Sequence, residues 1–325
     1  MKIKKPVAIV LGEPNSIFIE ILSKVLNKKK LYYPIILIGS KELILSQLKI
    51  LKKKLIFKQV DKNYLKYTKL KNKIYLIDIK YNFKKAFDQV SSKSKKYISK
   101  SFQTAFQLVN LNISKIIING PISKKHFLEN KYPGVTEYVF YNSKRKVSDK
   151  PGMLIFNKKL SVSPITTHIP LKDVNKKINK NLIINNITTI NNFYRKELNI
   201  IPKIAVLGIN PHCETKSKQN EELSIIKPSI KKLQKRKINV SGPYSADTFF
   251  LKKNISKYNS IIGMYHDQVL TPFKTLFGFD ASNITLGLPF VRLSVDHGPN
   301  ESMLGKNKSN PKSLENIFEL INLIV

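Results

Sequence analysis

The chain has 325 residues, 42% of them hydrophobic, which is enough for one large or two ordinary domains and excludes wholesale disorder. Its single cysteine, Cys213, excludes an intrachain disulfide and with it the class of small disulfide-stapled secreted domains. The apolar run near the start ends at Gly12, too early for a signal peptide, and no stretch approaches the roughly 18 apolar residues of a membrane span. We therefore expect a cytoplasmic protein with no membrane partner.

The chain is strongly basic, with 58 lysines and arginines against 21 acidic residues and a formal net charge of +37. The lysines are scattered along the whole chain and do not form one basic arm, and no basic and aromatic RNA-binding motif occurs. This distribution favours solvated lysine faces and no specific nucleic-acid partner. The resulting surface field should still attract anionic substrates.

The hydrophobic pattern predicts alternating strands and helices. Strand-like apolar runs lie at 6–12, 32–39, 73–79, 115–120, 203–210 and 260–265, and helical spacing occurs at 16–26, 94–108, 182–198, 225–233 and 314–324. This alternation predicts an α/β fold with a largely parallel sheet. Neither a G-x-G-x-x-G fingerprint nor a P-loop is present, so a Rossmann-type nucleotide site is not predicted.

Three of the five histidines follow strand-like runs: His168, His212 and His266. The carboxyl ends of parallel strands form the ligand crevice of open α/β sheets, so three imidazoles could meet there. Three neutral nitrogen ligands with an open position suit a catalytic divalent metal. Any one of these histidines alone is better explained as a hydrogen-bonded structural residue; as a set, they leave both interpretations open.

Two aspartates stand near these histidines in the sequence. Asp267 follows His266 directly, and Asp247 lies in the segment GPYSADTFF. Either carboxylate could orient a histidine or accept a proton. The competing interpretation for Asp247 is an N-cap of a helix that begins at Thr248.

The stretch at 272–302 carries further polar residues among glycines and apolar residues: Lys274, Asn283, Arg292 and His297. A lysine and an arginine beside a metal crevice suit a phosphate and a carboxylate. The alternative for Arg292 is a strand residue that snorkels to a neighbouring acid. For His297 we favour a turn histidine bonded to the backbone.

The chain contains the motifs TTHIPLKD, INPH, GPYSADT, YHDQ, NITLGLPFVRLSVDHG, NGPISK and GVTE. Taken together, these motifs resemble those of the 4-hydroxythreonine-4-phosphate dehydrogenase family of pyridoxal phosphate biosynthesis. They run from near residue 12 to about residue 305, so the resemblance covers nearly the whole chain. The combination is specific, although each piece alone is not.

The resemblance implies a fold similar to that of the isocitrate and isopropylmalate dehydrogenases. Two interleaved α/β domains, 1–130 with 285–325 and 131–284, would flank a cleft, in a homodimer with active sites at the subunit interface. The family's metal ligands fall on His168, His212 and His266, with one of the three from the partner subunit. Its substrate contacts fall on Thr136, Lys274, Asn283 and Arg292.

The implied reaction is a metal-dependent oxidation of 4-phosphohydroxy-L-threonine by NAD or NADP. It gives a 3-keto acid that decarboxylates to 3-amino-2-oxopropyl phosphate, on the route to pyridoxine 5′-phosphate. Three imidazoles favour Zn²⁺, with Mg²⁺ and Co²⁺ as alternatives. Asp247 and Asp267 are the candidates for the base.

The chain also departs from the family pattern. Val135 stands where the family has a histidine, Ser16 and Phe18 replace two glycines of the first turn, and Cys213 opens a segment that is glycine-rich in the family. Substrate identity is therefore open, and a dehydrogenase of threonate or erythronate 4-phosphate is an alternative. Two further alternatives are a three-histidine zinc hydrolase and a non-catalytic basic homologue that binds anions.

Overall fold

The computed structural model describes residues 5–28, 30–129, 131–144, 150–214, 220–278, 280–295 and 297–324. The chain divides into two compact units: Met1–Lys146 with Leu288–Phe318 form unit 1, and Val147–Gly287 with Glu319–Val325 form unit 2. Unit 1 contains helix α6 (Val135–Asn142), and the chain passes between the units at 146/147, 287/288 and 318/319. The division into 1–130 with 285–325 and 131–284 that the resemblance implies stays a prediction. In the described part of the chain, no helix combines the length and apolarity that a bilayer crossing requires.

The strands of unit 1 lie in the order β3-β4-β2-β1-β5-β12, and all their pairings are parallel. Their bounds are β1 Val7–Val10, β2 Ile35–Gly39, β3 Lys58–Gln59, β4 Ile74–Asp78, β5 Ile116–Asn119 and β12 Val291–Ser294. The central strands β1, β2 and β5 consist mainly of isoleucine, valine and leucine and are buried throughout. Such runs are typical of parallel strands with both faces covered.

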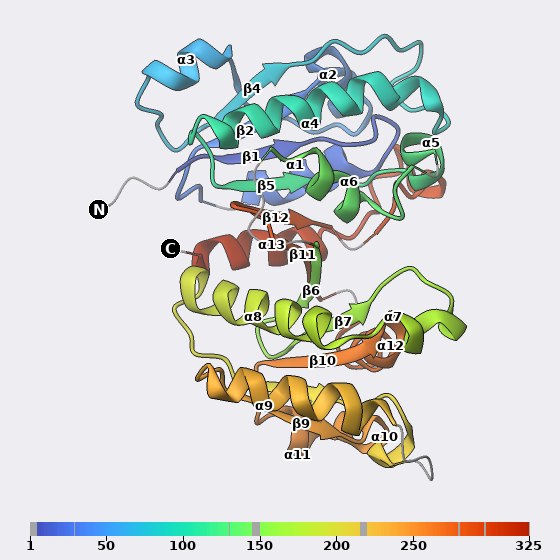
Figure 1. The fold of residues 1–325 in the computed structure, drawn as a ribbon. Coiled ribbons are helices and arrows are strands. Elements are labelled where there is room, and N and C mark those ends of the chain that lie inside the picture. Colours follow the sequence, from blue (N-terminus) through green and yellow to red (C-terminus); the bar gives the residue numbers. More distant parts are fainter. Residues whose placement is uncertain are drawn as a thin grey trace. The chain divides into compact units, whose positions relative to one another are not determined.

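Helices cover this sheet, and α4 shows why they do so (Figure 1). Helix α4 (Lys95–Asn110) buries Ile98, Phe102 and Ala105 on one face, at helical spacing, against the apolar cluster that contains strands β1 and β2. Burying a side chain such as Phe102 contributes about 1.5–3 kcal/mol. The other helices of unit 1 are α1 Phe18–Lys28, α2 Lys41–Ile50, α3 Lys62–Tyr67, α5 Lys124–Leu128 and α6.

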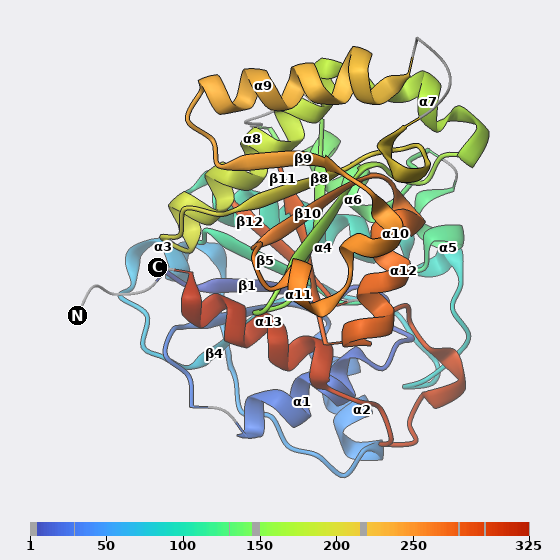
Figure 2. The same cartoon turned by 90° about the horizontal axis from the view of Figure 1, so that it is seen from below.

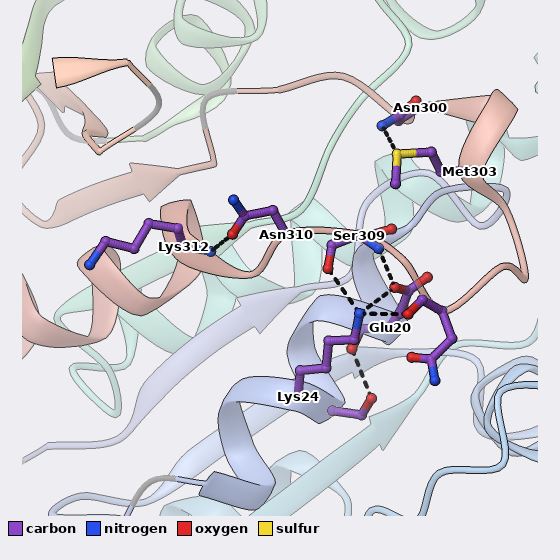
Figure 3. A network of polar contacts seen from close by, with 9 residues as sticks. Glu20, Lys24, Asn300, Met303, Ser309, Asn310 and Lys312 are labelled. Carbon is purple, nitrogen blue, oxygen red and sulfur yellow. Dashed lines mark hydrogen bonds and ion pairs between the residues drawn. The ribbon is translucent and has the colours of Figure 1, made fainter. Parts of the chain in front are cut away.

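A polar network connects helix α1 to the segment that leads into helix α13 (Lys312–Leu323), as Figure 3 shows. The Lys24 ammonium donates to Glu20 Oε1 at 2.7 Å and to the main-chain carbonyls of Asn307 and Ser309 at 3.1 and 2.9 Å. The backbone N–H of Ser309 donates to the same Glu20 oxygen at 2.7 Å. Because Glu20 is buried, these donors compensate the loss of its hydration, and the network fixes a late segment of the chain on an early helix.

The strands of unit 2 lie in the order β11-β6-β7-β10-β8-β9. Their bounds are β6 Gly152–Phe156, β7 Ser161–Thr166, β8 Ile204–Leu207, β9 Val240–Tyr244, β10 Ser260–Tyr265 and β11 Ser282–Leu286. Strands β7, β10, β8 and β9 pair in parallel, whereas β6 is antiparallel to both β11 and β7. The carboxyl ends of the four parallel strands therefore share one edge.

Helix α8 (Lys180–Glu197) and helix α9 (Lys227–Lys235) pack against each other on unit 2 (Figures 1 and 2). A π-helical turn at Glu222–Ile226 leads directly into α9. Helix α12 (His266–Phe277) buries Val269 and Phe273 in the second apolar cluster of the chain. The shorter helices of this unit are α7 Val174–Lys177, α10 Ala246–Phe249 and α11 Lys252–Ile255.

The predicted α/β class is confirmed, and the predicted elements are present with shifted ends. The helix predicted at 16–26 begins at Phe18, because the Ser16 hydroxyl donates to the carbonyl of Glu13 and accepts from the N–H of Phe18. The strand predicted at 203–210 ends at Leu207. The N–H groups of Ile209 and Asn210 donate to the Glu222 carboxylate and not to a neighbouring strand.

Candidate active site

Two of the three predicted histidines lie together at the carboxyl edge of unit 2. His266 follows strand β10 directly, and His168 stands two residues beyond Thr166, which is paired with Tyr265 in the parallel ladder. The centroids of the two imidazole rings are 6.1 Å apart. Two imidazoles can share one cation at this separation, since each ligating nitrogen lies about 2 Å from a bound zinc ion.

His212 lies in a short helical turn, Pro211–Cys213, that follows strand β8. Its imidazole is 76% exposed, and its Nδ1 is 3.7 Å from Oδ2 of Asp247. His212 and His168 both have a left-handed backbone, with φ of 55° and 42°. This conformation is uncommon for residues with a Cβ and tends to occur at functional sites.

The two aspartates differ in their contacts. Asp267 Oδ1 is 2.7 Å from Nδ1 of His266, a pairing that fixes the imidazole tautomer and leaves Nε2 for a ligand. Asp247 accepts hydrogen bonds from the Ser245 hydroxyl and from the N–H of Thr248, and these bonds lower the pKa of its carboxyl. Asp247 lies in the first turn of helix α10 and Ser245 is the N-cap residue, so the interpretation of Asp247 as the N-cap is wrong.

The donor chemistry of this edge, two imidazoles and nearby carboxylates, fits a divalent metal. Among the described residues, no group of three histidine, cysteine or acidic side chains is close enough to hold a metal ion. One chain brings His168 and His266 together and places His212 beside Asp247. That all three histidines share one ion, with one of them from the partner subunit, stays a prediction.

A buried arginine marks the other candidate region, in unit 1. Arg292 on β12 is 2% exposed, its Nε donates to Oδ1 of Asn119 at 2.7 Å, and its Nη1 donates to Oγ1 of Thr136 at 3.4 Å. The Asn119 amide in turn donates to the carbonyl of Gly120 at 2.9 Å. The guanidinium lies inside the unit, so the interpretation of Arg292 as a snorkelling side chain is wrong.

The Arg292 guanidinium remains a cation despite its burial. Burial lowers the pKa of Arg292 to about 10, and the charge of Glu137 opposes this shift. Arg292 is therefore protonated at neutral pH. Oε2 of Glu137 is buried, and no described residue makes a hydrogen bond to it. A buried cation with planar donors is suited to bind a carboxylate or a phosphate.

The remaining predicted contacts occupy defined positions. Lys274 lies half-buried on helix α12, where burial lowers the pKa of its ammonium. Asn283 lies half-buried on β11; its Oδ1 is buried and has no hydrogen-bond partner within the described part of the chain. Val135 packs against the apolar core of unit 1. His297 contacts the carbonyl of Gly298 through Nδ1 at 3.0 Å, as expected for a turn histidine.

Two polar residues of these regions were not identified from the sequence: Asn119, which contacts Arg292, and Glu222, which contacts the turn of His212. The position of Asn119 in the motif NGPISK was the only signal for it. No sequence signal pointed to Glu222, because its contacts form only after the chain folds.

The chain resembles known proteins over nearly its whole length. The family described as "Pyridoxal phosphate biosynthetic protein PdxA" matches residues 30–321. A 4-hydroxythreonine-4-phosphate dehydrogenase of Sulfurihydrogenibium sp. (strain YO3AOP1) is 37% identical over 98% of this chain and 97% of its own. One from Aquifex aeolicus (strain VF5) is 32% identical over 98% of this chain and 97% of its own.

Solved structures agree with these relatives. The crystal structure of a 4-hydroxythreonine-4-phosphate dehydrogenase from Burkholderia phymatum gives a TM-score of 0.82 at 26% identity and covers 99% of both chains. A terephthalate 1,2-cis-dihydrodiol dehydrogenase from Burkholderia xenovorans LB400, at 20% identity and a TM-score of 0.67 over 99% of both chains, shares the fold alone. The family match and the full-length relatives together show that the chain belongs to the PdxA family of pyridoxal phosphate biosynthetic proteins.

Proposed function

We propose that this chain oxidises 4-phosphohydroxy-L-threonine with NAD or NADP, in pyridoxine 5′-phosphate biosynthesis. The observation that carries the proposal is the pair of His168 and His266 at the carboxyl edge of unit 2, with Asp267 on Nδ1 of His266, in a chain of this family. Its full-length relatives are 4-hydroxythreonine-4-phosphate dehydrogenases, and their name supports the substrate class.

The residues that would hold the metal are His168, His212 and His266, with one of them from the partner subunit of a homodimer. A divalent cation, Zn²⁺ with Mg²⁺ and Co²⁺ as alternatives, supplies a Lewis acid that lowers the pKa of the substrate hydroxyl. Asp267 keeps His266 in the tautomer that exposes Nε2, and the 2.7 Å contact supports this role.

We assign the proton-accepting role to Asp247 in preference to Asp267. Oδ1 of Asp267 lies 2.7 Å from Nδ1 of His266, whereas Oδ2 of Asp247 lies 3.7 Å from Nδ1 of His212, beyond hydrogen-bond distance. The hydroxyl proton would pass to a carboxylate oxygen of Asp247 as hydride leaves for the nicotinamide. The 3-keto acid that results can lose carbon dioxide, because the new ketone accepts the electrons of the broken bond.

Four side chains would bind the anionic and polar groups of the substrate: Thr136, Lys274, Asn283 and Arg292. Arg292 provides a permanent positive charge with fixed donors, and the half-buried Lys274 provides a second charge. The buried, unpartnered Oδ1 of Asn283 can accept a hydrogen bond from a substrate donor.

A second candidate function is the oxidation of a related phosphorylated hydroxy acid, such as threonate or erythronate 4-phosphate. Val135 favours it, since this side chain packs on apolar residues where the family has a polar histidine. The second substrate class lacks the amino group of hydroxythreonine, so the loss of a polar contact is compatible with it.

The test is a spectrophotometric assay of NADH or NADPH formation with purified protein. Each of the three phosphorylated acids is supplied with each nicotinamide, with Zn²⁺, Mg²⁺ or Co²⁺ and after chelation. Turnover that is fastest with 4-phosphohydroxy-L-threonine supports the leading proposal, and a preference for threonate or erythronate 4-phosphate supports the second. No reduced nicotinamide under any of these conditions would contradict both, and would favour a hydrolase or an anion-binding homologue.

A further inference from the structure

A buried carboxylate contacts the turn that carries His212. Glu222 is 0% exposed and lies in the π-helical turn at Glu222–Ile226. Its Oε1 accepts from the backbone N–H groups of Ile209 and Asn210, both at 2.8 Å. Its Oε2 accepts from the Asn210 side-chain amide, also at 2.8 Å. One side chain thus receives three hydrogen bonds from the two residues that follow Gly208.

We propose that Glu222 is a positioning residue that holds the turn Gly208–Cys213 in the conformation that presents His212 to a divalent metal. This inference rests on the proposed function in one respect, namely that His212 acts as a metal ligand. No part of the proposed chemistry assigns a role to Glu222.

The turn needs support because its backbone is unfavourable for the residues it contains. His212 and the next residue, Cys213, have φ of 55° and 58°, in the left-handed region that residues with a Cβ rarely adopt. The turn is also tight: a Cβ built on Gly208 would lie 2.6 Å from Sγ of Cys213 and 3.0 Å from Oε1 of Glu222. Two consecutive residues in this region persist only where neighbouring groups hold them.

The start of the turn is held from a second side by the helix that begins with His266. Gln268 in the first turn of α12 donates from Nε2 to the carbonyl of Gly208 at 2.7 Å, and its Oε1 accepts from the N–H of Met264 at 2.7 Å. Gln268 holds the first carbonyl of the turn, and Glu222 holds the N–H groups that follow it. Glu222 therefore completes a clamp that connects the His212 turn to the edge where His266 lies.

The electrostatics of Glu222 agree with this role. Burial acts to raise the pKa of its carboxyl, and the hydrogen bonds from Asn210 and Ile209 outweigh burial and lower that pKa below its usual value. The group is consequently a carboxylate at neutral pH. Hydrogen bonds from N–H groups to a carboxylate are about twice as strong as those between neutral groups.

The adjacent acid provides a matched control. Glu221 accepts a hydrogen bond from the Asn210 side-chain amide to Oε2 at 3.0 Å, and among the described residues no backbone N–H of the turn donates to it. Its side chain is half-buried. Glu221→Gln therefore removes the same charge from a neighbouring position while the clamp stays intact.

The first experiment uses Cys213, the single cysteine of the chain, as a reporter in the metal-free protein. Burial and the charge of Glu222 raise the pKa of the Cys213 thiol and outweigh the backbone hydrogen bond of Gly208, which lowers it, so the intact turn should react slowly with an aromatic disulfide reagent. Because removal of the Glu222 charge by itself lowers this pKa, labelling is followed against pH and compared as the rate constant of the thiolate, which Glu222→Ala is expected to increase. Glu221→Gln is expected to leave it unchanged, and Glu222→Gln should lie between, since its amide oxygen still accepts from the backbone.

The second experiment measures Zn²⁺ and Co²⁺ affinity by titration of the full-length protein, with circular dichroism and thermal unfolding as checks of the fold. Residues that orient metal ligands typically contribute 10–100-fold in affinity, so Glu222→Ala is expected to weaken binding by about that factor. Glu222→Gln should recover part of the loss, and Glu221→Gln should bind as the wild type does.

The outcomes separate this inference from the proposed function. A folded Glu222→Ala protein that labels at the wild-type rate would overturn the inference, whatever the enzyme does. A wild type that binds no divalent metal would refute the proposed metal role of His212, while the labelling assay still decides whether Glu222 holds the turn. If Glu222→Ala does not fold, Asn210→Ala removes the side-chain part of the clamp and should give a smaller acceleration; wild-type labelling there would count against the inference.

Discussion

Glu13 provides a sharp test of the electrostatics of unit 1. It follows strand β1, is 2% exposed, and has one carboxyl oxygen without a hydrogen-bond partner. Burial raises the pKa of Glu13 from 4.5 to about 7, against the hydrogen bond that its other oxygen accepts from Ser94 at 3.0 Å. The folded protein thus keeps this proton up to about pH 7, whereas the unfolded chain loses it near pH 4.5.

The sign of the effect follows from proton linkage. Between these two pKa values the folded state binds more protons than the unfolded state, so the free energy of unfolding falls as the pH rises through this window. At about 1.4 kcal/mol per pKa unit, the ionisation of Glu13 lowers the free energy of unfolding of the wild type by about 3 kcal/mol at pH 8 and by about 1 kcal/mol at pH 5. Glu13→Gln removes the ionisation and keeps the shape and an acceptor for Ser94.

The assay is urea unfolding of wild type and Glu13→Gln at pH 5 and pH 8, followed by circular dichroism. We expect the variant to be more stable than wild type at both values, by about 2–3 kcal/mol more at pH 8 than at pH 5. Glu42→Gln, at an exposed position of helix α2, is the control and should give the same difference at both values. A stability difference for Glu13→Gln that does not change with pH would refute the reasoning.

Further predictions concern the two candidate regions and the core. Arg292→Met is expected to raise the KM for the phosphorylated substrate by an amount equivalent to about 2–5 kcal/mol of binding, measured by steady-state kinetics against a circular-dichroism check of the fold. Asp267→Asn should weaken metal affinity in a Co²⁺ titration by about 10–100-fold, because the amide no longer holds the His266 tautomer; unchanged affinity would exclude this role. Val135→His should raise kcat/KM for 4-phosphohydroxy-L-threonine, and an unchanged value would mean that the site is built for another ligand. Phe102→Ala should lower the free energy of unfolding in urea by about 3–5 kcal/mol, and a loss below 1 kcal/mol would contradict its place in the packed core.

Sequence patterns predicted the parts of the molecule that depend on local periodicity and strand order. The runs that became β1, β5 and β10 are continuous and apolar, so their type and approximate place followed from hydrophobicity. The proximity of His168 and His266 was also predictable, because parallel strands bring their carboxyl ends to one edge.

Features that depend on tertiary contacts could not be predicted from the sequence alone. Strand β6 is antiparallel within an otherwise parallel arrangement, and no local pattern specifies the direction of a neighbouring strand. The burial of Arg292 depends on its pairing with β5 and on the oxygen of Asn119, 173 residues away along the chain. In the sequence, Glu222 is one of two adjacent acidic residues, and only the folded structure shows that it contacts the turn of His212.

The interrupted path of unit 1 has a consequence for how the protein is made on the ribosome. Strand β5 pairs with β1 on one side and with β12 on the other, and β12 is encoded after nearly all of unit 2. At about 5–20 residues per second, the roughly 170 residues between these strands take on the order of 10–30 s to synthesise. Throughout that interval the isoleucine-rich margin of β5 lacks its final neighbour, and an unpaired strand edge of this kind is a template for pairing with another chain.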